Sequence, residues 1–187
     1  MSRGALLTGV AGGIIGAITS ALGIVWFAVA LSIAANFWLI IFSPIGADPL
    51  TLALVIIVAT LFVVTCILVG IGFYGIGQIG GGAMGTAALI VGIVLGSAAG
   101  ILLILGVYVF SLLSTISYVV LGVTFIIFGA ASISMREFTM RPSASMAAGI
   151  IGIIGGVLVI LLGVLGGALM FVSFIIWAIV FYSSREM

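Results

Sequence analysis

Every charge in this 187-residue chain lies outside its long apolar runs. The sequence has only seven charged residues: Arg3, Asp48, Arg136, Glu137, Arg141, Arg185 and Glu186. This distribution is expected in a membrane, because a charge at the centre of a bilayer is strongly unfavourable. With 66% hydrophobic and 4% charged residues, the chain lacks the polar surface that a water-soluble domain needs. We therefore predict an all-α integral membrane protein, a polytopic helical bundle that forms one transmembrane domain over residues 1–187.

Polar interruptions divide the chain into candidate membrane spans. Loops are predicted at Ser43–Pro49, Gly77–Thr86 and Ser134–Ser145, with a shorter break at Ser111–Thr115. A bilayer core of about 30 Å needs roughly 20 helical residues. Single spans are therefore predicted over Thr51–Gly75, Ala87–Phe110 and Thr115–Ile133.

The first apolar segment, Ala5–Phe42, is longer than one span requires. We expect a single helix that extends past the bilayer, with Asn36–Trp38 in the interfacial layer that favours amphipathic aromatic residues. A break near Ser20 would instead produce a seven-span protein.

The last apolar segment, Met146–Tyr182, is also too long for one comfortable span. We expect two helices joined by a tight turn near Gly166 and Gly167. One long tilted helix is the alternative, and it would give five spans instead of six.

Internal similarity favours six spans, arranged as three pairs of helices. Three glycine-bounded stretches have equal length: Gly9–Gly23, Gly92–Gly106 and Gly149–Gly163. In addition, Thr124–Glu137 aligns without gaps on Ser173–Glu186, including the closing Arg-Glu pair. We predict three hairpin-like units, each with a Gly-rich helix followed by an aromatic-rich helix, at about residues 5–77, 87–137 and 146–187.

The arginines provide an orientation. With six spans, all four arginines fall on one side of the membrane and Asp48 falls on the other. Because cytoplasmic loops are enriched in basic residues, both termini and the Arg-bearing loops are predicted to be cytoplasmic. The expected location is a prokaryotic plasma membrane.

Gly70, Gly72 and Gly75 match the G-x-G-x-x-G spacing of dinucleotide-binding loops. That fingerprint requires a preceding strand and an acidic residue about 20 positions later. Here the preceding run has the character of a membrane helix, and no acidic residue occurs between Asp48 and Glu137. The stretch also loosely resembles a potassium-channel filter, but the Thr-x-Gly-Tyr-Gly order is absent. We therefore predict no cofactor at these glycines.

Close helix packing explains the glycines better than a nucleotide site or an ion filter does. Helices in lipid associate largely through van der Waals contact, and small residues four positions apart let two backbones approach. This spacing recurs in each Gly-rich stretch. The predicted packing residues are Gly9, Gly13, Gly92, Gly96, Gly100, Gly152, Gly156, Gly163 and Gly167. Their spacing leaves open whether these faces meet within one chain or between chains.

The residue inventory argues against catalysis. The chain has no His, no Lys and no paired carboxylates, so no catalytic or metal-binding residue is predicted. Cys66 is interpreted as a small apolar packing residue. No ionisable side chain is expected at mid-membrane depth, where ion-coupled transporters usually have one.

The stretch Ala87–Glu137 resembles the repeat of the HdeD-like acid-resistance membrane proteins. It pairs a Gly-containing helix with a second helix that ends in "LGVTFIIFGAASI". The similarity is partial in the third unit and poor in the first, and the turn lacks the proline common in that family. The resemblance implies a six-span, non-enzymatic membrane protein linked to stress tolerance.

Two functions are consistent with these features. The first is a non-catalytic protein that acts through helix packing, as a structural or accessory subunit of a membrane complex or as a small homo-oligomer. The alternative is a passive channel or carrier for a small neutral solute or ion. The expected partners are membrane lipid and other membrane subunits or further copies of the chain, and no nucleic acid is expected because basic residues are so scarce.

Overall fold

The protein is a bundle of long helices. The computed structural model describes residues 2–33, 49–108, 111–162 and 164–186. Within these ranges, six helices are long and apolar enough to cross a membrane. They are α1 (Ser2–Ile33), α3 (Pro49–Ile76), α4 (Gly82–Tyr108), α5 (Ser111–Ser134), α6 (Pro142–Leu162) and α7 (Val164–Ser184). The prediction of an all-α polytopic membrane bundle is confirmed.

The first segment forms one helix. α1 runs without a break from Ser2 to Ile33, so the seven-span alternative with a division near Ser20 is wrong. Its 32 residues correspond to about 48 Å at 1.5 Å per residue, which exceeds a bilayer core of about 30 Å. The predicted interfacial residues Asn36–Trp38, and Asp48 with most of the predicted Ser43–Pro49 loop, lie outside the described residues.

The last segment forms two helices, so the five-span alternative is also wrong. The predicted position of their turn is wrong as well, because α7 already begins at Val164 and includes Gly166 and Gly167. Gly166 lies against the backbone of Val159 in α6, where even a Cβ atom would collide. This glycine therefore permits close contact between two helices and does not form the turn.

The connection between α3 and α4 is shorter than predicted. A five-residue connection, η2 (Gly77–Gly81), follows α3 and contains a kink, because the backbone of Gly80 is not helical (φ 178°, ψ −14°); α4 begins at Gly82. Gly82 has a φ of +30°, a conformation that L side chains rarely adopt. The predicted loop through Thr86 is therefore wrong in its second half. A helical backbone satisfies its own polar groups in lipid, which favours helix over open loop here.

The predicted break at Ser111–Thr115 is likewise part of a helix, because α5 begins at Ser111. At the other end of α5, the polar connection contains the short 3-10 helix η3 (Arg136–Phe138). Helix α6 then begins at Pro142. Proline is well tolerated at a first helical position, where its missing N–H would have no partner within the helix.

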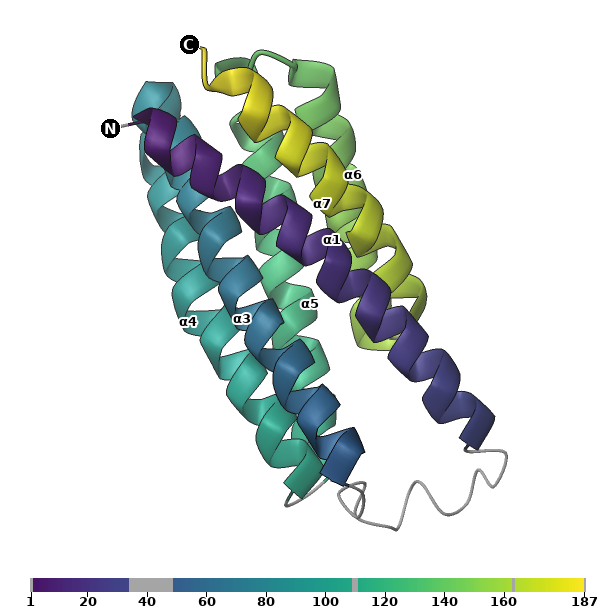
Figure 1. Cartoon of the computed structure of the whole chain (residues 1–187). Helices are drawn as coiled ribbons and strands as arrows, with labels where there is room; N and C mark the ends of the chain where they lie inside the picture. The colour runs from purple at the N-terminus through teal and green to yellow at the C-terminus, as the bar shows by residue number, and fades with distance from the viewer. Residues whose placement is uncertain (1, 34–48, 109–110, 163, 187) are drawn as a thin grey trace.

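Consecutive helices run antiparallel, and the bundle closes on itself (Figure 1). Each helix packs against its neighbours along the chain, and α1 packs against α7. As a result, each of α1, α4 and α6 lies between two of α3, α5 and α7. Both ends of the described chain lie at one end of the bundle, together with the α5–α6 connection (Figure 1).

Candidate functional site

Glycines of α1 bring it close to two helices at once. A Cβ atom added to Gly9 would lie 2.5 Å from the Cα atom of Gly72 in α3 and 2.9 Å from the ring of Phe181 in α7. One added to Gly13 would lie 2.8 Å from Ala178 in α7. Real Cβ contacts are essentially never this short, so any larger residue must displace a helix. Both predicted packing residues thus lie at contacts within the chain.

Gly92, Gly96 and Gly100 of α4 face α3. A Cβ atom at Gly96 would lie 2.5 Å from the Cβ atom of Cys66, and one at Gly92 would collide with the carbonyl oxygen of the same residue. Gly100 lies against Val63, one turn away along α3. Cys66 is fully buried, so its thiol fills space between two membrane helices.

The α5–α6 contact is a reciprocal approach of backbones. An added Cβ atom at Gly156 would lie 2.6 Å from the carbonyl oxygen of Gly122, and one at Gly122 would lie 2.5 Å from that of Gly156. Gly129 and Gly149 form a second pair of the same kind. Of these four glycines only Gly156 was predicted, because Gly122 and Gly129 are seven residues apart in an aromatic-rich helix and Gly149 has no glycine four positions away.

The remaining predicted glycines differ in how closely they approach a neighbouring helix. Gly152 lies close to Trp177 and Ser173 of α7, with an added Cβ atom 3.0 Å from the indole ring. Gly167 makes only ordinary contact, since an added Cβ atom would lie 3.6 Å from Ile24. Gly163 lies outside the described residues.

The three glycines of the G-x-G-x-x-G spacing are also placed within helix α3. Gly70 faces Ala88 and Leu89 of α4, while Gly72 and Gly75 face α1. These glycines lie at helix–helix contacts, and their helix follows no strand within the described residues.

Aromatic rings fill the centre of the bundle. Phe73 of α3 packs against both Phe128 of α5 and Trp177 of α7, with ring centroids 5.7 and 5.6 Å away. Phe128 and Trp177 also meet each other edge to face, at 6.1 Å. Phe125 and Phe174, which are matched in the sequence alignment, pack edge to face at 5.5 Å. All five rings are almost completely buried, so they connect α3, α5 and α7 across the bundle axis.

This aromatic centre was not predicted from the sequence. The gapless alignment offered a signal, because it pairs Phe125 with Phe174 and Phe128 with Trp177. Nothing in the alignment shows that these positions point inward, since the neighbouring residues are equally apolar.

A buried polar network joins α5, α6 and α7 beside these rings. The Ser132 hydroxyl donates to the Ser145 carbonyl oxygen at 2.8 Å, and the Ser145 hydroxyl donates to the Ser132 carbonyl oxygen at 2.8 Å. The indole N–H of Trp177 donates to Ser132 Oγ at 3.1 Å. Separately, Ser173 donates to the Ala148 carbonyl oxygen at 2.7 Å. These bonds fix the rotation of each helix relative to its neighbours.

Ser132→Ala is expected to destabilise the protein by about 1–2 kcal/mol, because it leaves the buried indole N–H without an acceptor. Ser183→Ala is the matched control, since that hydroxyl bonds only the Val180 carbonyl of its own helix. Unfolding by SDS titration would measure both. A double-mutant cycle with Trp177→Phe should show non-additivity of roughly 0.6 kcal/mol. Equal effects of Ser132→Ala and Ser183→Ala would contradict the network.

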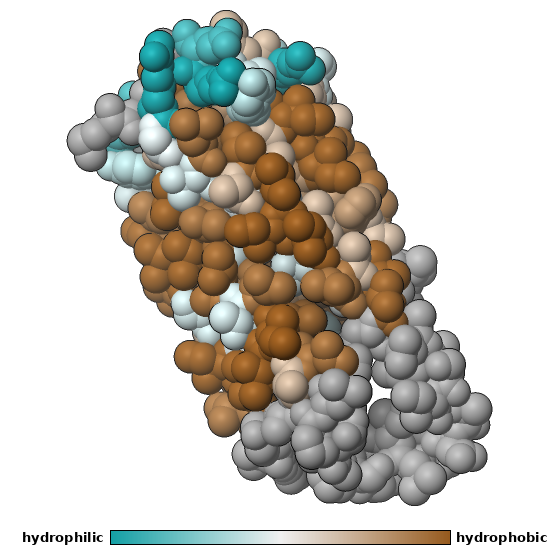
Figure 2. Space-filling model, in the orientation of Figure 1, coloured by the Kyte–Doolittle hydropathy of each residue, from teal (hydrophilic) through white to brown (hydrophobic). Residues whose placement is uncertain are grey.

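All four arginines lie at one end of the bundle, the end that holds both chain termini. Figure 2 shows hydrophilic residues gathered there and hydrophobic residues over most of the remaining described surface in view. Contacts place the connections at this end too, because the Met140 N–H donates to Ser184 Oγ at 3.3 Å and Gly80 lies against the Phe138 ring. We call this region the basic end.

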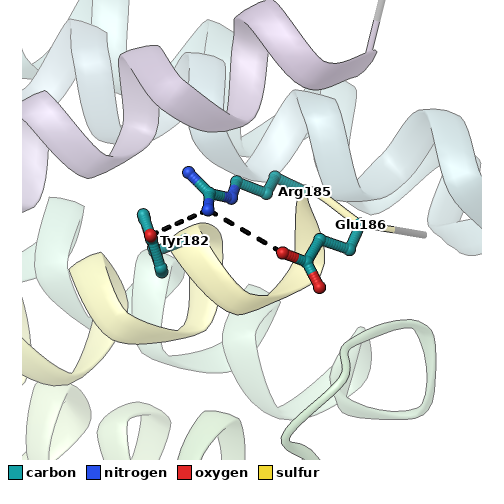
Figure 3. A network of polar contacts seen from close by, with 3 residues as sticks. All are labelled: Tyr182, Arg185 and Glu186. Carbon is teal, nitrogen blue, oxygen red and sulfur yellow. Dashed lines mark hydrogen bonds and ion pairs between the residues drawn. The ribbon is translucent and has the colours of Figure 1, made fainter.

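At the basic end, Arg185 lies against Tyr182 (Figure 3). Its guanidinium carbon is 3.7 Å from the centroid of the Tyr182 ring, and Nη2 donates to the Tyr182 hydroxyl at 2.7 Å. The same nitrogen is 3.8 Å from Glu186 Oε1, in an exposed ion pair of the kind that contributes little to stability. Tyrosine therefore sets the direction of this arginine side chain.

An apolar groove runs along the outer surface between α1 and α7, with a volume of about 690 Å³. Its lining residues are Val10, Ile14, Ala17, Ile18, Ala21, Leu22, Val25, Phe171, Ile175, Ala178, Ile179 and Tyr182. Small alanines form its floor, since Ala17 and Ala178 are buried, while larger residues such as Ile18 and Ile179 are exposed beside them. We call this feature the α1/α7 groove.

Among the described residues, no group of three or more His, Cys, Asp or Glu side chains could hold a metal ion. Comparisons with protein-family models, curated proteins and solved structures find no match. The resemblance of Ala87–Glu137 to HdeD-like repeats therefore stays a prediction.

Proposed function

We propose that this protein is a non-catalytic multi-pass membrane protein that acts through helix packing, as a structural or accessory subunit of a membrane complex or as a small homo-oligomer. The main support is the filled centre, in which rings from α3, α5 and α7 meet at centroid distances of 5.6–6.1 Å. A bundle packed in this way is suited to a rigid scaffold. The same packing favours a scaffold over a passive channel or carrier along the bundle axis.

The glycine contacts refine this proposal. Gly9, Gly92 and Gly156 each approach another helix of the same chain so closely that no further helix fits against them. Association with partners would therefore use the outward aliphatic surfaces, such as those of α4 and α6. In lipid such contacts depend on van der Waals complementarity, because burying apolar surface there yields no hydrophobic gain.

Native mass spectrometry after mild-detergent extraction from the source membrane tests the proposal. A stoichiometric assembly with a larger membrane protein would support an accessory role, and a defined homo-oligomer would support the second form. A lone monomer that conducts a solute into liposomes would contradict the proposal and support the passive channel. The suggested link to stress tolerance comes from the resemblance alone, and survival of a deletion strain at low pH would test it.

The proposed orientation places the basic end in the cytoplasm. Ser143→Cys is a suitable probe, because Ser143 is exposed at the start of α6 and the native Cys66 is buried. A membrane-impermeant maleimide should label this variant in inside-out vesicles and not in right-side-out vesicles. The unmodified chain should stay unlabelled in both and react only after SDS denaturation. Labelling of the variant from the outside alone would reverse the orientation.

A further inference from the structure

We propose that the α1/α7 groove binds one anionic phospholipid, with an acyl chain in the groove and the phosphate at Arg185. This inference does not depend on the role proposed above, because a lipid site would serve a subunit, an oligomer or a transporter equally well. It rests on the shape of the groove, its length and the charge at one of its ends.

The groove has the chemistry of an acyl-chain site. Its walls are made entirely of aliphatic and aromatic residues from two helices, and its volume of about 690 Å³ lies within the range of small-molecule sites. The buried alanines Ala17 and Ala178 create the hollow, because larger neighbours such as Ile14 and Ile175 project beside them.

The length of the groove is comparable to the thickness of one leaflet. It runs from Phe171 to Tyr182 along α7 and from Val10 to Val25 along α1, which corresponds to about 16 Å and about 22 Å at 1.5 Å per residue. A leaflet contributes about 15 Å to a hydrocarbon core of about 30 Å. The groove therefore extends from the basic end to the middle of the membrane, as the chain of a lipid in that leaflet would.

Charge at the basic end selects the headgroup. Tyr182 lines the groove and also holds Arg185, so the guanidinium lies where the groove reaches the membrane surface. An arginine presents several N–H donors in a planar array that suits a phosphate. Among the described residues, Arg185 contacts only Tyr182 and, weakly, Glu186. On α1, the exposed Arg3 lies two helical turns before the groove residue Val10 and on the same side of the helix. Each helix that forms the groove thus has an arginine at its end or directly after it, Arg3 in the first turn of α1 and Arg185 just after α7.

The experiment reconstitutes the full chain in nanodiscs that contain equal amounts of dioleoyl phosphatidylglycerol and dioleoyl phosphatidylcholine. Native mass spectrometry then measures which lipid stays bound one-to-one. We expect phosphatidylglycerol to be retained. Arg185→Gln should weaken this retention about tenfold, as expected for the loss of charge-assisted hydrogen bonds. Arg141→Gln removes the same charge from the same end at a residue that does not line the groove and is not bonded to Tyr182, and it should change retention less than about twofold.

A groove variant provides a second, independent measurement. Ile179→Trp places a larger side chain into the groove from an exposed position and should reduce retention of both lipids. Equal losses in Arg185→Gln and Arg141→Gln would overturn the proposal in favour of unspecific attraction to the basic end. Equal retention of both lipids by the unmodified chain would also overturn it. If Ile179→Trp instead dissociates a second copy of the chain or another protein, the groove is a protein interface and the lipid assignment is wrong.

Discussion

Trp177→Ala is expected to destabilise the protein by about 3–5 kcal/mol, the usual range for removing a large buried aromatic side chain. Trp177 is fully buried and contacts the rings of Phe73, Phe128 and Phe174. Its removal leaves a cavity where α3, α5 and α7 meet, and it also removes the hydrogen bond to Ser132. Because all these contacts lie in one place, no neighbouring side chain can replace the lost volume without moving a helix.

The measurement is reversible unfolding in mixed detergent micelles, followed by circular dichroism. Ile154→Ala is the control, because Ile154 is 48% exposed on the outer side of α6 and its truncation should cost less than about 1 kcal/mol. If Trp177→Ala does not fold, Trp177→Phe is a milder version of the same test. It is expected to lower the free energy of unfolding by about 1–2 kcal/mol. Equal stability of Trp177→Ala and Ile154→Ala would show that the aromatic centre does not hold the bundle together.

Gly9→Ala is expected to destabilise the protein by about 1–3 kcal/mol, although alanine is the better helix former. The new methyl group would lie 2.5 Å from the Cα atom of Gly72 and 2.9 Å from the Phe181 ring. The first of these atoms belongs to a backbone, so relief requires α1 and α3 to separate. That separation also weakens the contact between α1 and α7, which closes the bundle.

The same substitution elsewhere in α1 supplies the control. Gly23→Ala places its methyl group in open space, so only the helix propensity changes, and stability should stay equal or rise by up to about 1 kcal/mol. Both variants can be compared by thermal unfolding in the same detergent. Similar stability of the two variants would contradict a close approach of α1 and α3 at Gly9.

The elements were predicted more accurately than their junctions. The single long α1 and the three internal spans were expected from length and composition, and the division of Met146–Tyr182 into two helices was expected from the internal similarity and the distribution of arginines. The observed junctions lie a few residues from their predicted positions, because a helix is the favoured backbone conformation wherever lipid is the solvent. Ser111–Ser114 and Gly82–Thr86 are helical for this reason, although their residues would suit a loop in water.

The packing glycines were predicted only in part. Glycine spacing identified Gly9, Gly13, Gly92, Gly96 and Gly100 before their partners were visible. It also included Gly167, which makes only ordinary contact. The spacing shows that a helix has a smooth face, and it does not show which helix lies against that face.

By itself, the sequence determined the solvent and the helical secondary structure of this protein, and it favoured six spans over five or seven. Sparse charge placed the chain in lipid, and the lengths of the apolar runs determined where helices cross. Only the tertiary structure decided which side of each helix points inward. In water a polar face marks the outside of a helix, but these helices are apolar all round, as is suitable when the surrounding medium is hydrocarbon. The aromatic centre at Phe73, Phe128 and Trp177 and the groove that ends at Arg185 therefore depend on how the helices pack, a property that no periodicity in the sequence records.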